Sequence, residues 1–160
     1  MYTAEALADI HERTQGSLGM ILAHAGALGQ EAVDRTLPGF AYPTVRLQIH
    51  HVLGAERYWI GVIHGRMVGD DDEAAFPTIA SLAALRAEVA ALTRAYLAGA
   101  STGELNTPRP MVTWGGKERV LMPARVVLRT QTHVYQHQGQ ITAMVRLLGS
   151  PLVGSDFPIA

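Results

Sequence analysis

Apolar residues recur at spacings of three and four through four long segments of this chain, and that periodicity limits the fold more than any other feature of the sequence. The clearest segment runs from Thr78 to about Ala98, and its apolar positions are Leu82, Leu85, Val89, Leu92 and Tyr96. Such spacing puts one continuous apolar stripe on an α-helix. Residues 3–34, 44–64 and 123–148 show the same kind of pattern, and Pro or Gly residues separate the segments. The sequence therefore predicts four amphipathic helices.

The connection between the third and fourth helices, residues 101–122, has a different character. Pro108 and Pro110 disfavour a helix there, and Gly115-Gly116 lies between two short apolar runs, an arrangement that allows a hairpin turn. No internal repeat or domain linker divides the chain. We therefore expect an all-α fold, a four-helix bundle with a long irregular crossover between helices three and four, in a single domain that spans residues 1–160.

Composition argues against several functional classes. The formal net charge of −1 and the scatter of Lys and Arg along the chain argue against a nucleic-acid-binding protein. Cysteine is absent, which leaves His, Asp, Glu or water as metal ligands and fits a reducing cytoplasm. Charges or glycines interrupt every apolar run before it reaches the length of a membrane span, and the first residues do not have the pattern of a signal peptide. We therefore expect a cytoplasmic protein with no membrane partner.

The fourth helix carries the most informative polar residues. His133 and His137 are four positions apart, so both imidazoles point to the same side of the helix. The same stripe continues through Ile141, Met144 and Leu148. The two rings therefore face the interior of the bundle, where they can either bind one metal ion or be held neutral by hydrogen bonds with backbone carbonyls or Thr and Gln side chains. The residues alone leave both alternatives open.

The second helix offers a third ligand. Either His50 or His51 could reach across the bundle, but adjacent helical residues diverge by about 100°, so the two are not expected to bind together. Periodicity puts His50 nearer the polar side and His51 beside the apolar stripe, and it does not choose firmly between them. His24, on the first helix, is a more distant candidate. Three imidazoles on one side of an ion would leave positions for water or substrate, and neutral imidazoles suit Zn, Ni, Cu or Fe(II).

Two segments resemble a known family. HVLGAERYW on the second helix and HVYQHQGQITAMVRLLGSP on the fourth are similar to motifs of the DinB-like (DinB/YfiT) superfamily of metal-dependent bacterial proteins, which is distinct from the DNA polymerase of the same name. The resemblance extends over nearly the whole chain and implies a metal triad of His51, His133 and His137. It also implies a homodimer. The family often has Arg after the second histidine of the fourth helix, where this chain has Gln138. We expect that difference to affect a subunit contact or the surroundings of the ligands, and not the metal itself.

The resemblance also implies a reaction class. Better-characterised relatives include thiol-dependent transferases and a thiol-dependent isomerase, so we expect a divalent-metal-dependent S-transferase or hydrolase in stress response or detoxification. Its partners would be a small-molecule substrate or a low-molecular-weight thiol, and its cofactor one Zn, Ni or Fe ion. The alternative is a non-catalytic metal-binding module that responds to stress or senses a ligand.

Four further polar or aromatic residues stand close to these histidines in the sequence. Gln140 and Glu56 are the polar side chains to test next. Glu56 could orient a ligand or act as a general base, but the sequence favours a salt bridge on the helix surface. Tyr58 and Trp59 are expected in the core or in a pocket wall.

Overall fold

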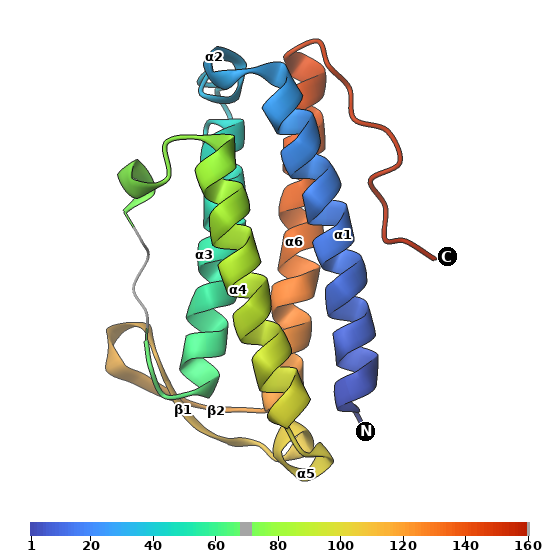
Figure 1. Cartoon of the computed structure of the whole chain (residues 1–160). Helices are drawn as coiled ribbons and strands as arrows, with labels where there is room; N and C mark the ends of the chain where they lie inside the picture. The colour runs from blue at the N-terminus through green and yellow to red at the C-terminus, as the bar shows by residue number, and fades with distance from the viewer. Residues whose placement is uncertain (68–71, 160) are drawn as a thin grey trace.

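Four long helices lie side by side in the computed structural model of the chain, which describes residues 1–67 and 72–159 (Figure 1). They are α1 (Ala4–Leu28), α3 (Val45–Ile63), α4 (Ile79–Gly99) and α6 (Pro123–Leu147). In the ring around the core, α3 and α1 each pack against both α4 and α6. The predicted all-α bundle is therefore confirmed.

Threonine caps set where three of these helices begin. Thr3 accepts a hydrogen bond from the Ala6 amide, and Thr44 accepts one from the Leu47 amide, so each hydroxyl satisfies an amide of the first turn. Thr78 and Ser81 form a reciprocal capping box at the start of α4. The fourth long helix begins with Pro123, whose fixed φ suits the first turn.

The first helix is shorter than the sequence predicted. It ends at Leu28, and Gly29 follows with φ 84°, a left-handed conformation that interrupts the helix before the short α2 (Gln30–Val33). The predicted segment 3–34 therefore contains two helices. A glycine in a helical pattern can continue the helix or end it, and apolar spacing does not distinguish the two outcomes.

Residues from all four long helices form the main core, and the most deeply buried are aliphatic. The stripe of α4 agrees with the prediction except at Leu92, which is 43% exposed. Thr93 takes the inward position instead and is fully buried. Thr93 faces inward because its hydroxyl donates a hydrogen bond to the buried carboxylate of Glu56.

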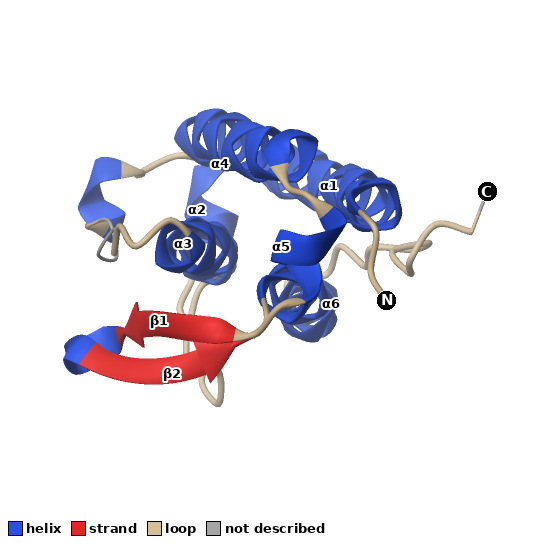
Figure 2. Ribbon diagram, turned by 90° about the horizontal axis from the view of Figure 1, so that it is seen from below, coloured by secondary structure: helices blue, strands red, loops and turns tan. Residues whose placement is uncertain are grey.

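The segment between α4 and α6 was predicted to be an irregular crossover, but it contains regular secondary structure. A short helix, α5 (Thr102–Asn106), precedes an antiparallel hairpin of β1 (Arg109–Thr113) and β2 (Lys117–Leu121). The hairpin turns through Gly115 and Gly116, at φ 68° and 71°, as the sequence indicated. Seen along the bundle, it lies outside the helices on the side of α3 and α6 (Figure 2).

The directions of the helices could not be read from the sequence. Helices α1 and α6 run one way and α3 and α4 the other, so the chain between Ile63 and Ile79 joins opposite ends of the bundle (Figure 1). After α6 the chain turns back along the outside of α1, where the Arg13 guanidinium donates to the carbonyl of Pro158. Within residues 1–67 and 72–159, no helix has the length and apolar character to span a membrane.

Candidate metal centre

Three histidines from two helices meet between α3 and α6. His51 comes from α3, and His133 and His137 come from successive turns of α6. Each offers one ring nitrogen, and these three nitrogens all lie within 4.8 Å of one another. The cluster contains the same three residues that the family resemblance implied as ligands.

The two imidazoles of α6 have the separation that one metal ion requires. Their Nε2 atoms are 3.1 Å apart. Two ligands at the usual Zn–N distance of about 2.0–2.1 Å and 3.1 Å from each other subtend roughly 100° at the ion, which is near the tetrahedral angle. The donor set of three imidazoles suits Zn, Ni, Cu or Fe(II). The residues present therefore fit a divalent transition metal.

A buried glutamine fixes the tautomer of His137. Gln48 Nε2 donates to the backbone carbonyl of Tyr42 and to Oε1 of Gln140, at 3.0 Å in both cases, so Gln48 must turn its own Oε1 toward His137. That oxygen lies 2.7 Å from His137 Nδ1 and can only accept, so Nδ1 carries the proton. The lone pair of His137 is consequently on Nε2, which faces His133.

The third histidine is held by an aromatic ring. Tyr42, in the loop before α3, stacks on His51 with ring centroids 4.0 Å apart and an interplanar angle of 19°. The same residue supplies the carbonyl that orients Gln48, so one loop residue supports two of the three imidazoles. Gln140, which the sequence had singled out, bonds to Gln48, which in turn bonds to His137.

The protonation state of the pair also suits metal binding. Burial, and then the nearby His137 and His51, lower the pKa of His133 to about 4. Burial also lowers the pKa of His137. Both rings are therefore neutral at pH 7 and can use a lone pair to bind a cation.

A pocket of about 310 Å³ opens over this cluster. Its lining residues are Tyr42, His51, Ala55, Tyr58, Trp59, Trp114, Arg129 and His133. Trp114 comes from the hairpin and stacks on Tyr58, with centroids 5.3 Å apart, and its backbone amide donates to the Tyr58 hydroxyl. The hairpin therefore builds one wall of the pocket, and Tyr58 and Trp59 line it as expected.

The family assignment follows from this arrangement and from one comparison. A family model described as the DinB superfamily matches residues 6–141, a range that contains all three histidines. The chain belongs to the DinB superfamily. No curated protein matches it.

The remaining candidate histidines of this DinB-superfamily protein lie elsewhere. His50 is buried, with 8% exposed, and its ring lies 5.5 Å from that of Phe76, away from the cluster. Its predicted place near the polar side of the helix is wrong. His24 Nε2 pairs with the backbone carbonyl of Ser150 and links α1 to the segment after α6. Gln138 is also buried, which argues against the subunit contact considered for it.

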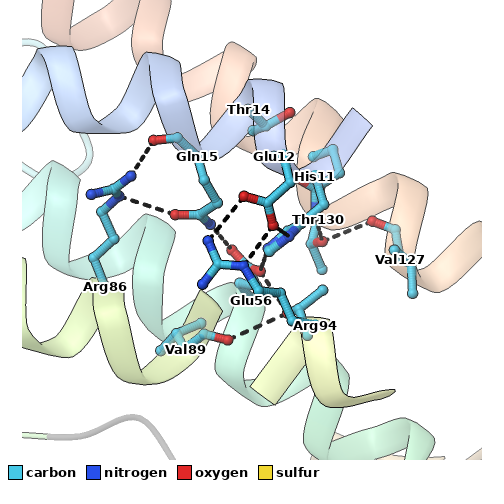
Figure 3. A network of polar contacts seen from close by, with 12 residues as sticks. His11, Glu12, Thr14, Gln15, Glu56, Arg86, Val89, Arg94, Val127 and Thr130 are labelled. Atoms are coloured by element: carbon cyan, nitrogen blue, oxygen red, sulfur yellow. Dashed lines mark hydrogen bonds and ion pairs between the residues drawn. The ribbon is translucent and has the colours of Figure 1, made fainter. Parts of the chain in front are cut away.

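Glu56 has a role that the sequence analysis misjudged. It is 1% exposed, so the favoured interpretation as a surface salt bridge is wrong. Figure 3 shows it between α1 and α4, where its carboxylate accepts from His11 Nε2 at 3.0 Å, from Gln15 Nε2 at 3.1 Å and from the Thr93 hydroxyl at 2.7 Å. Arg86 extends the network by donating to Gln15. These bonds tie three helices together on the side of α3 opposite the histidine cluster.

Two residues that support the site were missed, and one of them had a detectable signal. Gln48 lies three positions before His51 and therefore on nearly the same face of α3. A buried amide on that face needs a polar partner, which the histidines of α6 provide. Tyr42 gave no signal, because its position depends on the path of the loop and loops have no periodicity.

Proposed function

We propose that this chain is a divalent-metal-dependent enzyme that catalyses thiol-dependent S-transfer or hydrolysis. The observation that supports this best is the pocket over the histidine cluster: His51 and His133 line it, so the ligands are open to a small molecule on one side. A structural metal site is normally closed by protein ligands, whereas a catalytic one retains an open position.

The residues of the chain have separable tasks in this proposal. His51, His133 and His137 hold the ion, and Gln48 keeps His137 in the tautomer that can bind it. When bound, a divalent ion supplies Lewis acidity, which lowers the pKa of a bound thiol or water and polarises a substrate group. The aromatic walls exclude part of the solvent from the pocket, and this strengthens electrostatic interactions inside it.

The choice of a thiol comes from the family resemblance and not from the geometry. Thiol-dependent transferases and a thiol-dependent isomerase are among the relatives, so a low-molecular-weight thiol is the proposed partner. A homodimer in the cytoplasm and a role in stress response belong to the same proposal. Zn, Ni and Fe are the metals to compare, because imidazole suits each of them.

Metal content tests the site directly. After loading with zinc and dialysis, the parent protein is expected to retain about one ion per chain, whereas His51→Ala, His133→Ala and His137→Ala each lose most of it. His50→Ala is the matched control, because it removes the adjacent buried imidazole and should leave the metal content unchanged. Equal metal content in the parent and the three variants, measured by inductively coupled plasma mass spectrometry, would rule out this site.

Turnover is tested separately. The metal-loaded protein is assayed with panels of thiols and electrophiles, and with ester and amide substrates in water, before and after chelation. Product formation that disappears with the chelator and with His133→Ala supports the enzyme. A protein that binds metal at the three histidines and turns over none of these substrates would instead be the non-catalytic module.

A further inference from the structure

A second pocket continues from the first along α6. It has a volume of about 370 Å³, and its lining residues are Trp59, Arg119, Val120, Leu121, Met122, Arg125, Val126 and Arg129. Trp59 and Arg129 line both pockets. The two spaces are therefore neighbours, and a molecule that reaches the histidine cluster can extend past Trp59 into the second one. Volumes of about 300–1,000 Å³ are typical of small-molecule sites.

Three guanidinium groups line this second pocket, which we call the arginine groove. Arg125 and Arg129 are one turn apart on α6, and Arg119 comes from β2. Cations four residues apart on a helix repel each other. Both α6 arginines are exposed, so neither charge is buried in the core of the bundle.

These arginines also lack the partners that other arginines of the chain have. Arg46, Arg57 and Arg94 form ion pairs with Asp34, Glu88 and Glu12. By contrast, among residues 1–67 and 72–159 no carboxylate pairs with any arginine of the groove. The groove therefore concentrates unneutralised positive charge in a protein whose formal net charge is −1.

One of the arginines is already positioned for a ligand. The guanidinium carbon of Arg129 lies 4.9 Å from the centre of the Trp59 ring, a cation–π contact that limits its motion. A stacked guanidinium keeps its N–H donors free at the edge, where they can bind a carboxylate or phosphate through two parallel bonds. Arg129 also lines the pocket that contains His51 and His133, so an anion bound to it would lie beside the metal cluster.

We propose that the arginine groove binds the acidic end of the substrate, and that the substrate is a low-molecular-weight thiol with two or more anionic groups. Its sulfur would enter the pocket over the histidines while its acidic groups pair with Arg129, Arg125 and Arg119. The identity of the thiol end rests on the function proposed above, but the anion-binding groove does not. Trp59 forms the shared wall between the two ends.

Calorimetric titrations of the zinc-loaded protein with three ligands distinguish anion binding in the groove from thiol binding at the histidine cluster. Succinate has two carboxylates and no thiol, 2-mercaptoethanol has a thiol and no charge, and mercaptosuccinate has both. We expect the double variant Arg125→Gln/Arg129→Gln to bind succinate and mercaptosuccinate about tenfold more weakly or worse, because two charge-assisted contacts are lost. Its binding of 2-mercaptoethanol should not change. Higher salt should weaken succinate binding to the parent.

Arg146→Gln is the control for charge alone, since Arg146 is also exposed on α6 and lies far along the helix from the groove. It should leave all three affinities unchanged. Far-UV circular dichroism and the melting temperature establish that each variant folds. The proposal that the groove binds anions is contradicted if succinate does not bind the parent. It is also contradicted if succinate binds the parent and the double variant equally well. If succinate depends on the arginines but mercaptosuccinate binds no more tightly than succinate, the groove stands and the thiol function fails.

Discussion

Gln48 fixes the orientation of one candidate ligand, His137. Its amide is held on one side by Tyr42 and Gln140, and its oxygen holds His137 on the other. Loss of this bond would let His137 rotate or adopt the other tautomer. Partners of this kind, which contact a ligand and not the ion, typically account for a factor of about 10–100 in metal affinity.

We therefore expect Gln48→Ala to weaken zinc binding by about 10- to 100-fold in competition with a chromogenic chelator. Gln131→Ala is the control, because Gln131 is a glutamine of α6 that is equally buried and bonds to Thr130 and not to a histidine. It tests whether loss of any buried amide has the same effect. An affinity of Gln48→Ala within twofold of the parent would contradict the role assigned to Gln48.

Glu56 offers a prediction about stability. Glu56→Ala would leave His11 and Gln15 buried without their acceptor, whereas the Thr93 hydroxyl can still donate to the Val89 carbonyl, 3.4 Å away. Each unsatisfied buried polar group costs about 1–3 kcal/mol. We expect the free energy of unfolding in urea to fall by about 3 kcal/mol or more. Glu88→Ala, which removes an exposed ion-pair partner of Arg57, should change it by less than about 1 kcal/mol. Similar losses in the two variants would show that the network contributes little.

Residue roles could be predicted from the sequence only where a pattern singled them out. The spacing of His133 and His137 identified two of the clustered histidines, but the choice of His51 over His50 required the motif. Glu56 was misjudged because the residues that donate hydrogen bonds to it lie on two other helices. His11 had a signal: it lies four positions after Leu7 and three before Thr14, on the buried stripe of α1.

The glycines of α1 differ in what surrounds them. At Gly16 a Cβ atom would meet nothing within 4 Å, whereas at Gly19 it would lie 3.2 Å from the guanidinium of Arg86. Close approach at Gly19 allows Arg86 to donate to Gln15. The missing side chain at Gly19 therefore lets a side chain of α4 approach the backbone of α1.

A matched pair of substitutions follows from this difference. Gly16→Ala should raise the free energy of unfolding by about 0.5–1 kcal/mol, because alanine favours the helix and meets no neighbour. Gly19→Ala should give less than this or a net loss, since Arg86 must move. Urea denaturation of both variants checks the pair. An equal gain at both positions would mean that Arg86 relaxes without cost.

At the level of elements, the four long helices were predictable because each has an apolar stripe and an end signal. The break at Gly29 was not, because a single glycine in a helical pattern is ambiguous. Periodicity also could not predict that Thr93 faces the core in place of Leu92, since that orientation depends on a hydrogen bond to another helix. The hairpin was predictable as a hairpin, but its position beside α3 was not.

The whole molecule should remain folded whether or not a metal ion occupies the three histidines. Residues of all four long helices build a continuous apolar core, so a bound ion would add a link between α3 and α6 but would not be needed to hold them. At free metal about 100-fold above the dissociation constant, binding adds about 2.7 kcal/mol, or about 5–10 °C in melting temperature for a chain of this size.

Chelation is therefore expected to lower the melting temperature by that amount and to leave the far-UV circular dichroism at 25 °C unchanged. His133→Ala serves as the control and should melt at the same temperature with and without chelator. Unfolding on chelation would assign the ion a structural role, and an unchanged melting temperature in the parent would argue against binding altogether.

The relative directions of the helices are a property of the whole molecule that local patterns do not encode. Parallel α3 and α4 follow from the connection between them, and a sequence specifies which face of a helix is apolar more clearly than which way its neighbour runs. Local patterns did not predict the pocket either, because its walls come from segments far apart in the sequence, which include Tyr42, Trp59 and Trp114.

That convergence gives the protein an internal optical probe. The chain has two tryptophans, and both Trp59 and Trp114 line the pocket over the three histidines. Its tryptophan fluorescence therefore originates entirely at the place where metal and small molecules are proposed to bind. Trp114 is 58% exposed, so a ligand that covers it should shift its emission to shorter wavelength, and Ni²⁺ or Cu²⁺ at the histidines should quench both rings. Occupancy of the pocket can thus be followed in the unlabelled protein.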